Sequence, residues 1–152
     1  MKIDLRTLPE EGTTLQGELS PGGYDLPCEE GQSWAPIEYR VFVQILGQEC
    51  LVAGRLATAL HTPCARCLEP LRHPVEVAKF EHSFEVEGKD IIDLTLQIRE
   101  DIVLGLPLVI RCVLEADGRC PVTGQIHGPA TDPEPASLQE DIWGALDQWK
   151  EK

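Results

Sequence analysis

The chain has 152 residues, 42% of them hydrophobic, and a formal net charge of -13. This length suffices for one domain with its own core. The negative charge disfavours nonspecific nucleic-acid binding, in which Lys and Arg neutralise phosphates, and favours basic partners. No run approaches the ~20 apolar residues of a transmembrane helix, and MKIDLRTLPEEG lacks the apolar core of a secretory signal. We therefore expect a cytoplasmic protein without a membrane partner, whose six cysteines are free or metal-bound rather than disulfide-linked.

The front half of the sequence predicts three antiparallel strands. Residues 20–36 are rich in Gly and Pro, which indicates a long loop after an N-terminal strand. Residues 37–46 alternate apolar and polar side chains, and Gly47 with Gln48 suits a two-residue hairpin loop. Further strands are expected over about 50–61 and 72–86. In the last of these the apolar phase changes near Ala78 and Lys79, which predicts a β-bulge.

The back half predicts helices. From Asp93 onward, apolar residues recur at four-residue spacing, which indicates an amphipathic helix that Gly105 and Pro107 end. The alternation over 92–98 also permits a strand at the start of this segment. Ser137 and Glu140 form a capping box for a last amphipathic helix.

These elements together predict an α+β protein. We expect an antiparallel β-meander or partly closed barrel with one packed helix and a C-terminal helix. The expected organisation is a single domain with a cysteine cluster over residues 1–123, a linker rich in Pro and Gly over 124–136, and the amphipathic helix over 137–152.

The cysteines carry the strongest chemical signal. Cys64 and Cys67 form a C-x-x-C step in the connection between the second and third predicted strands. Such a turn presents two thiolates in the geometry that a tetrahedral metal needs from half of its ligands. Cys112 and Cys120 follow the helix and supply the second half of a predicted structural zinc site. The alternative is that all four are free thiols, which pack as small hydrophobes or lie on the surface. The sequence assigns no role to Cys28 and Cys50.

Two catalytic interpretations of the same cysteines find less support. The zinc deaminase signature needs an upstream H-x-E, and His61, the first histidine of the chain, is followed by Thr62 and Pro63. A thioredoxin-like motif needs its C-x-x-C at the start of a helix, whereas Pro70 and a strand-like run follow here. The chain also lacks the common nucleotide-binding motifs. We expect no enzymatic activity and no small-molecule substrate.

A local excess of basic residues surrounds the cysteine turn. The candidates for contact with an RNA backbone are Arg55, Arg66, Arg72 and Lys79. The alternative is a solvated face on which the arginines pair with Glu69 and Glu76. Trp143 and Trp149 of the last predicted helix are candidates for partner binding, because a detached helix should not expose so much apolar surface.

The runs TPCARCLEP, DLTLQIREDIVLGLPLVIRC and GRCPVTG occur in this order. In this combination the chain resembles the YceD family, the large ribosomal RNA subunit accumulation proteins, over about residues 50–150. The resemblance implies a non-enzymatic protein with metal-ligand candidates at Cys64, Cys67, Cys112 and Cys120 and a basic residue at Arg66. Many relatives read C-P-x-C-G at the last site, where Thr123 here replaces a possible ligand.

The expected function is therefore ribosome biogenesis. We expect the chain to support 23S rRNA accumulation or processing and assembly of the large subunit, by binding large-subunit rRNA or its precursor, a basic ribosomal protein, or both. The alternative is a small metal- or thiol-dependent redox enzyme that uses Cys64 and Cys67.

Overall fold

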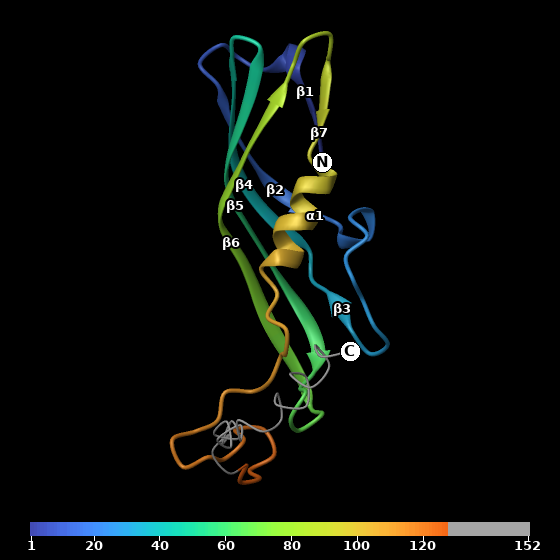
Figure 1. Cartoon of the computed structure of the whole chain (residues 1–152), viewed down its shortest axis with the longest axis vertical. Helices are drawn as coiled ribbons and strands as arrows, with labels where there is room; N and C mark the ends of the chain where they lie inside the picture. The colour runs from blue at the N-terminus through green and yellow to red at the C-terminus, as the bar shows by residue number, and fades with distance from the viewer. Residues whose placement is uncertain (128–152) are drawn as a thin grey trace, which may run out of the picture. The chain divides into compact units, whose positions relative to one another are not determined.

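The computed structural model in Figure 1 describes residues 1–127. The chain divides into two compact units, Met1–Cys112 and Val113–Lys152. The predicted C-terminal helix, with Trp143 and Trp149, and the predicted linker from residue 128 onward lie outside the described residues.

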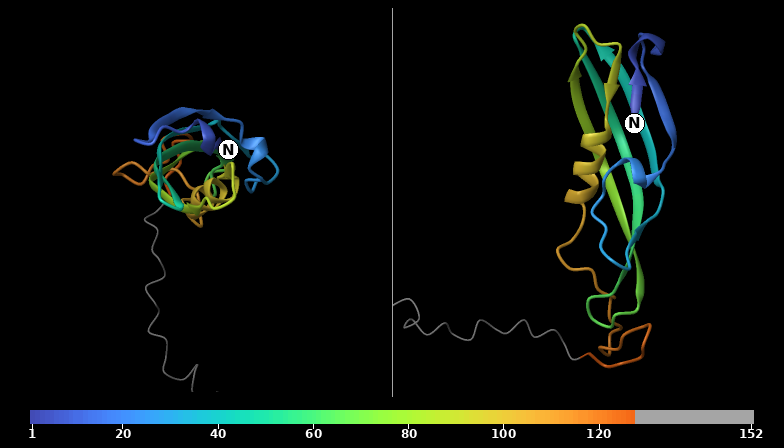
Figure 2. Two further views of the ribbon diagram at one scale, coloured as in Figure 1. Left: turned by 90° about the horizontal axis from the view of Figure 1, so that it is seen from above. Right: turned by 90° about the vertical axis from the view of Figure 1, so that its right-hand side faces the viewer.

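An antiparallel sheet of five strands forms the first unit. Its strands are β2 (Thr13–Leu19), β3 (Ser33–Trp34), β4 (Ile37–Leu46), β5 (Glu49–Pro63) and β6 (Pro70–Glu85). The order is β2-β4-β5-β3. Strands β4 and β3 both pair with one edge of β5, and β6 pairs with its other edge. The sheet curves strongly (Figure 2) but is not closed into a barrel. The predicted α+β class is thus confirmed, with an open meander rather than a barrel.

The β4–β5 hairpin forms where the alternating pattern places it. Leu46 pairs with Glu49 across the two-residue turn, and Gly47 there has a φ of 64°. This positive φ is the conformation that such a turn demands and that glycine adopts without strain. Every second side chain of β4 therefore faces the core, where Ile37, Val41 and Val43 are buried.

The predicted β-bulge interrupts the pairing of β5 with β6. Gly54 pairs with Phe80, whereas Leu56 pairs with Val77, so Ala78 and Lys79 together lie opposite one residue of β5. The extra residue changes the phase of β6. Both Val75 and Phe80 are consequently buried although they lie five positions apart.

One helix packs on this sheet. Strand β7 (Ile91–Asp93) precedes α1 (Thr95–Leu104), so the sequence between 91 and 104 holds both of the elements that its pattern permits. The carboxylate of Asp93 accepts hydrogen bonds from the backbone N–H and the hydroxyl of Thr95, which satisfies one free donor of the first helical turn. Ile98 and Ile102, one turn apart, are buried in the core.

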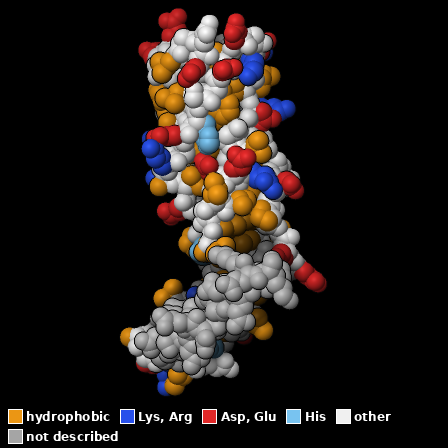
Figure 3. Space-filling model, in the orientation of Figure 1, with side chains coloured by type: hydrophobic (Ala, Val, Ile, Leu, Met, Phe, Trp, Pro, Cys, Tyr) orange, Lys and Arg blue, Asp and Glu red, His pale blue; other side chains and the backbone are white. Residues whose placement is uncertain are grey.

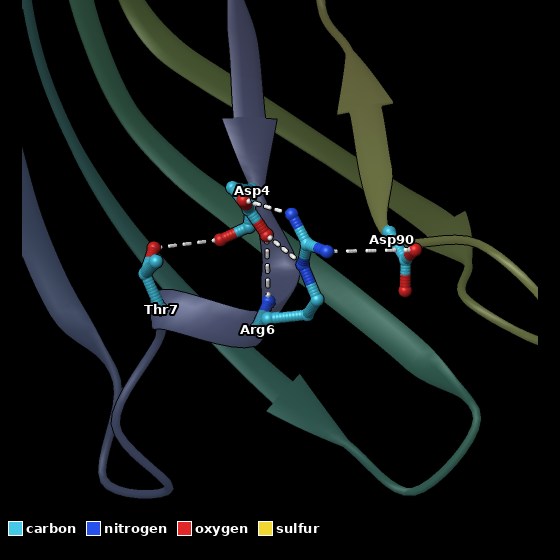
Figure 4. Close-up of polar contacts among 4 residues, drawn as sticks. All are labelled: Asp4, Arg6, Thr7 and Asp90. Carbon is cyan, nitrogen blue, oxygen red and sulfur yellow. Dashed lines mark hydrogen bonds and ion pairs between the residues drawn. The ribbon is translucent and has the colours of Figure 1, made fainter.

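A second, two-stranded sheet joins β1 (Lys2–Asp4) to β7. Ile3 pairs with Ile92, and both are buried. Beyond β1 the chain enters a short 3₁₀ turn, in which Arg6 donates two side-chain hydrogen bonds to Asp4 and lies 3.9 Å from Asp90 (Figure 4). Because these groups are largely exposed, this ion-pair network contributes little to stability.

The described residues of the second unit, 113–127, form a small hairpin. Arg119 pairs with Ile126 as an antiparallel bridge, and the backbone N–H of His127 donates to the carbonyl of Gly118 at 2.9 Å. Gly118 has a φ of 80° at the preceding turn. Residues 124–127, at the start of the predicted linker, take part in this hairpin.

Candidate metal centre

The connection between β5 and β6 is a tight turn that carries the C-x-x-C step. Pro63 pairs with Pro70, and the six residues between them close the hairpin. The N–H of Cys64 donates to the carbonyl of Glu69 at 2.9 Å, and the N–H of Leu68 donates back to the carbonyl of Cys64 at 2.9 Å. Leu68 has a φ of 62°, which is unusual for a residue other than glycine and costs on the order of 1 kcal/mol. The fold maintains this strained turn at the cysteines.

Three sulfurs gather at this turn. Those of Cys64, Cys67 and Cys112 all lie within 4.8 Å of one another, and Cys64 and Cys112 are buried. Cys112 belongs to the segment that follows α1. The N–H of Ala65 donates to the carbonyl of Ile110 at 2.9 Å, which ties that segment to the turn. The structure thus brings together three of the four predicted ligands.

The sulfur of Cys64 is surrounded by hydrogen-bond donors. Burial favours the neutral thiol, but backbone N–H groups of Cys67, Cys112 and Arg66 and the side chain of Cys67 outweigh it and lower the pKa of Cys64 to about 6. The N–H of Cys112 lies 3.1 Å from this sulfur and that of Arg66 lies 3.4 Å from it. Hydrogen bonds to a charged acceptor favour its charged form. The site therefore stabilises a thiolate at Cys64.

These residues fit a thiophilic metal ion. A tetrahedral zinc with Zn–S bonds of ~2.3 Å places its ligand sulfurs roughly 3.8 Å apart, and the three sulfurs of this cluster lie within 4.8 Å of one another. A donor set of sulfur alone favours zinc over the hard cations magnesium and calcium, which take oxygen ligands. N–H groups directed at a ligand sulfur are the outer-shell support that metal sites use. Cys64, Cys67 and Cys112 would hold the ion, which would supply folding free energy there.

The fourth predicted ligand, Cys120, lies in the second unit, in a turn that repeats the hydrogen bonding of the first. The N–H of Cys120 donates to the carbonyl five residues later, in Gln125, at 2.9 Å. The N–H of Gly124 returns to the carbonyl of Cys120 at 2.8 Å, and its φ is 68°. Both turns thus place a buried cysteine first and a left-handed residue fifth. Thr123 occupies the position that Cys67 has in the first turn.

Among the described residues, the remaining two cysteines are not part of this cluster. Cys50 lies in β5 opposite Phe84 and is fully buried, and burial raises the pKa of its thiol. It packs as a small hydrophobic side chain. Cys28 is exposed in the loop before β3, with its sulfur 3.3 Å from the carbonyl of Gln32.

The predicted RNA-contact residues do not form one cluster. Arg55 and Arg72 are exposed in β5 and β6, whereas Arg66 is half-buried in the cysteine turn, where one of its guanidinium nitrogens lacks a hydrogen-bond partner among the described residues. Lys79 stands at the bulge and pairs with Glu81 at 3.1 Å. In the part of the chain that the structure describes, no ion pair links these arginines to Glu69 or Glu76.

Sequence reasoning missed Arg40, which lies directly across from Arg55. Like charges opposite one another on neighbouring strands destabilise a sheet by up to about 1 kcal/mol. The two arginines line an open cavity of about 710 Å³ together with Glu18, Glu38 and Glu76. The signal was available, because the turn at Gly47 fixes the register that pairs Arg40 with Arg55.

Comparison of the chain with models of protein families, with curated proteins and with solved structures finds no match. Among the described residues, no helix has the length and apolar character to cross a bilayer.

Proposed function

We propose that this chain is a non-enzymatic cytoplasmic factor that supports 23S rRNA accumulation or processing and large-subunit assembly. The sequence supports this proposal through the three ordered motifs, in which the chain resembles the YceD family. The main structural support is the three-thiol cluster, in which Cys64 and Cys112 are buried and Cys67 is half-buried. Structural zinc sites are closed, whereas catalytic ones keep a position open for water or substrate.

The metal in this proposal is zinc, held by Cys64, Cys67 and Cys112, with Cys120 as the fourth ligand. Zinc would attach the segment after α1 to the β5–β6 turn. The repeated hydrogen-bond pattern around Cys120 supports its assignment as a ligand, since a turn of this kind also presents Cys64. Metal ligation would couple to folding, because the thiolates must be deprotonated and brought together.

The RNA contact in this proposal involves Arg40 and Arg55, with Arg72 on the same sheet. Arg40 and Arg55 are exposed, and their unfavourable juxtaposition would be relieved by an anion between them. A phosphate is such an anion, and Arg binds it through two parallel hydrogen bonds. The carboxylates that line the same cavity would weaken nonspecific binding.

A redox enzyme that uses Cys64 and Cys67 is the second candidate, favoured by the lowered pKa of Cys64. A thiolate is the nucleophilic form of cysteine. The rate of alkylation by iodoacetamide separates the two functions. A structural site predicts slow modification that chelation accelerates, whereas an enzyme predicts fast modification without chelation.

Co-sedimentation with large-subunit precursors tests the main proposal. The wild-type chain should sediment with precursor particles, and the charge reversal Arg40→Glu with Arg55→Glu should reduce this association. Lys89→Glu, which changes an exposed cation in the turn before β7, is the matched control. Absence of the wild-type chain from precursor fractions would refute the proposed function.

A further inference from the structure

A groove with an apolar floor lies in the first unit, between the loop before β3 and the segment after α1. Its volume is about 490 Å³. Its apolar lining consists mainly of Leu60, Pro63, Ala65, Leu106, Leu108 and Val109. Leu108 is fully exposed and Val109 is 53% exposed. Large apolar side chains in such positions mark sites of interaction.

Hydrogen bonds hold both walls of the groove in place. On one wall, Gln32 donates to the hydroxyl of Thr62 at 3.1 Å and the indole of Trp34 donates to the carbonyl of Pro27 at 2.9 Å. On the other, the bond from Ala65 to the carbonyl of Ile110 fixes the segment after α1. A groove with fixed walls costs less conformational entropy when it binds a ligand.

The charge of the groove selects the kind of occupant. Glu29 and Glu30 line one side, and none of the lining residues is Lys or Arg. Acidic side chains are also spread over the visible face of the molecule (Figure 3), consistent with the net charge of -13. The chain's own residues 128–152 carry six Asp and Glu residues against two Lys, so they do not complement this rim.

We propose that this groove binds a basic amphipathic segment of a partner protein. Apolar side chains of that segment pack on Leu106, Leu108 and Val109, while its Lys and Arg side chains face Glu29 and Glu30. This mode resembles that of other amphipathic helices laid in apolar grooves. The inference rests on the proposed function, because it assigns a surface to the basic ribosomal partner.

The test uses a fluorescein-labelled synthetic helix of Leu and Lys, with the leucines at helical spacing. Its binding to the full chain is measured by fluorescence anisotropy at increasing salt. Two control helices replace every Lys with Glu, or every Leu with Ser. The groove variants are Leu108→Asp and the double change Glu29→Lys with Glu30→Lys. The matched controls lie at the opposite end of β5 from the groove. They are Leu46→Asp, at the end of β4, and the double change Glu85→Lys with Glu87→Lys, at the end of β6 and just after it.

The proposal predicts that the Leu and Lys helix binds, that binding weakens with salt, and that each groove variant weakens it at least about tenfold. The matched controls should bind as the wild type does. Equal binding by either control helix, or equal loss in the matched controls, would overturn the proposal. So would three results that identify another occupant: much tighter binding after removal of residues 128–152, a dimer that Leu108→Asp dissociates, or preferential competition by single-stranded RNA.

Parallel co-sedimentation with ribosomal precursors distinguishes this inference from the proposed function. If the groove variants bind no synthetic helix but still sediment with precursors, the groove has a role and the precursor contact lies elsewhere. If the wild-type chain binds the helix but does not sediment with precursors, the groove stands and the proposed function fails. A wild-type chain that does not bind the helix overturns the groove proposal alone.

Discussion

The backbone N–H of Cys112 donates a hydrogen bond to the sulfur of Cys64 at 3.1 Å, although the two residues are 48 positions apart. This bond holds the backbone of Cys112 against the side chain of Cys64. The donors that stabilise a thiolate at Cys64 are therefore part of the fold. A metal would find this part of its environment already built.

The cysteine cluster should retain about one zinc per chain through purification under reducing conditions. Cys64→Ser and Cys112→Ser should each abolish this content and lower the free energy of unfolding by on the order of 3 kcal/mol or more, because the metal links distant parts of the chain. Elemental analysis and urea unfolding measure the two effects.

Cys28→Ser is the matched control, since Cys28 is exposed and is not part of the three-sulfur cluster, and it should keep the metal. Cys120→Ser tests the proposed fourth ligand separately, and this variant should lose the metal as Cys64→Ser and Cys112→Ser do. Protein never exposed to chelator that contains no metal would contradict this prediction.

The metal-free protein should show a pH-dependent stabilisation by Cys64. The folded state lowers the pKa of this thiol from 9.0 to about 6. Its thiolate therefore stabilises the folded state fully above about pH 9, and this contribution is lost as the pH falls toward 6. The difference in unfolding free energy between wild type and Cys64→Ser should therefore grow as the pH rises from about 6 to about 9. A constant difference would show that the hydrogen bonds do not favour the thiolate.

The start of α1 should depend on Asp93. Asp93→Ala removes the acceptor for Thr95 and should cost about 1 kcal/mol at neutral pH. Hydrogen bonds from the side chain and then the backbone of Thr95 lower the pKa of Asp93. This contribution is present above about pH 4 and is lost as the pH falls through the lower folded-state pKa. Urea unfolding at neutral and acid pH measures it, with Glu100→Ala, exposed on the same helix, as control.

Leu68→Gly should stabilise the chain or leave its stability unchanged, even though it removes a large side chain. Leu68 is 77% exposed and adopts a φ of 62°, so the change loses little packing and relieves strain of about 1 kcal/mol. Leu46→Gly removes an exposed leucine in a strand and should destabilise. Thermal unfolding of the two variants measures this. Equal destabilisation would show that the turn at Leu68 carries no strain.

Local sequence patterns predicted the elements whose partners are close in the chain. The strand over 37–46 follows from its alternating pattern, and the turn after it follows from Gly47. The bulge at Ala78 follows from the change of apolar phase in β6, which is what buries Phe80. The pairing of β1 with β7 was not predicted, since it joins Ile3 to Ile92, residues far apart in the chain. Nor could any local pattern reveal the short strand β3.

The site shows the same division. The C-x-x-C spacing identified Cys64 and Cys67 as neighbours on a turn, whereas the approach of Cys112 to them depends on the tertiary fold. The hydrogen bonds that favour the thiolate come from backbone groups, which carry no sequence signature. Arg40 was missed because its neighbour Arg55 is adjacent only through the hairpin register.

The hairpin origin of the cysteine turn also has a kinetic consequence. Strands β4, β5 and β6 are consecutive and joined by short turns, so their pairing involves contacts close in sequence, which form quickly. Cys112 arrives only when the segment after α1 has docked. If the hairpin forms before that segment docks, Cys64 and Cys67 are uncovered on a formed turn in the interval and are accessible to either a metal or an oxidant. A reducing environment during synthesis then matters more for this chain than it does once folding is complete.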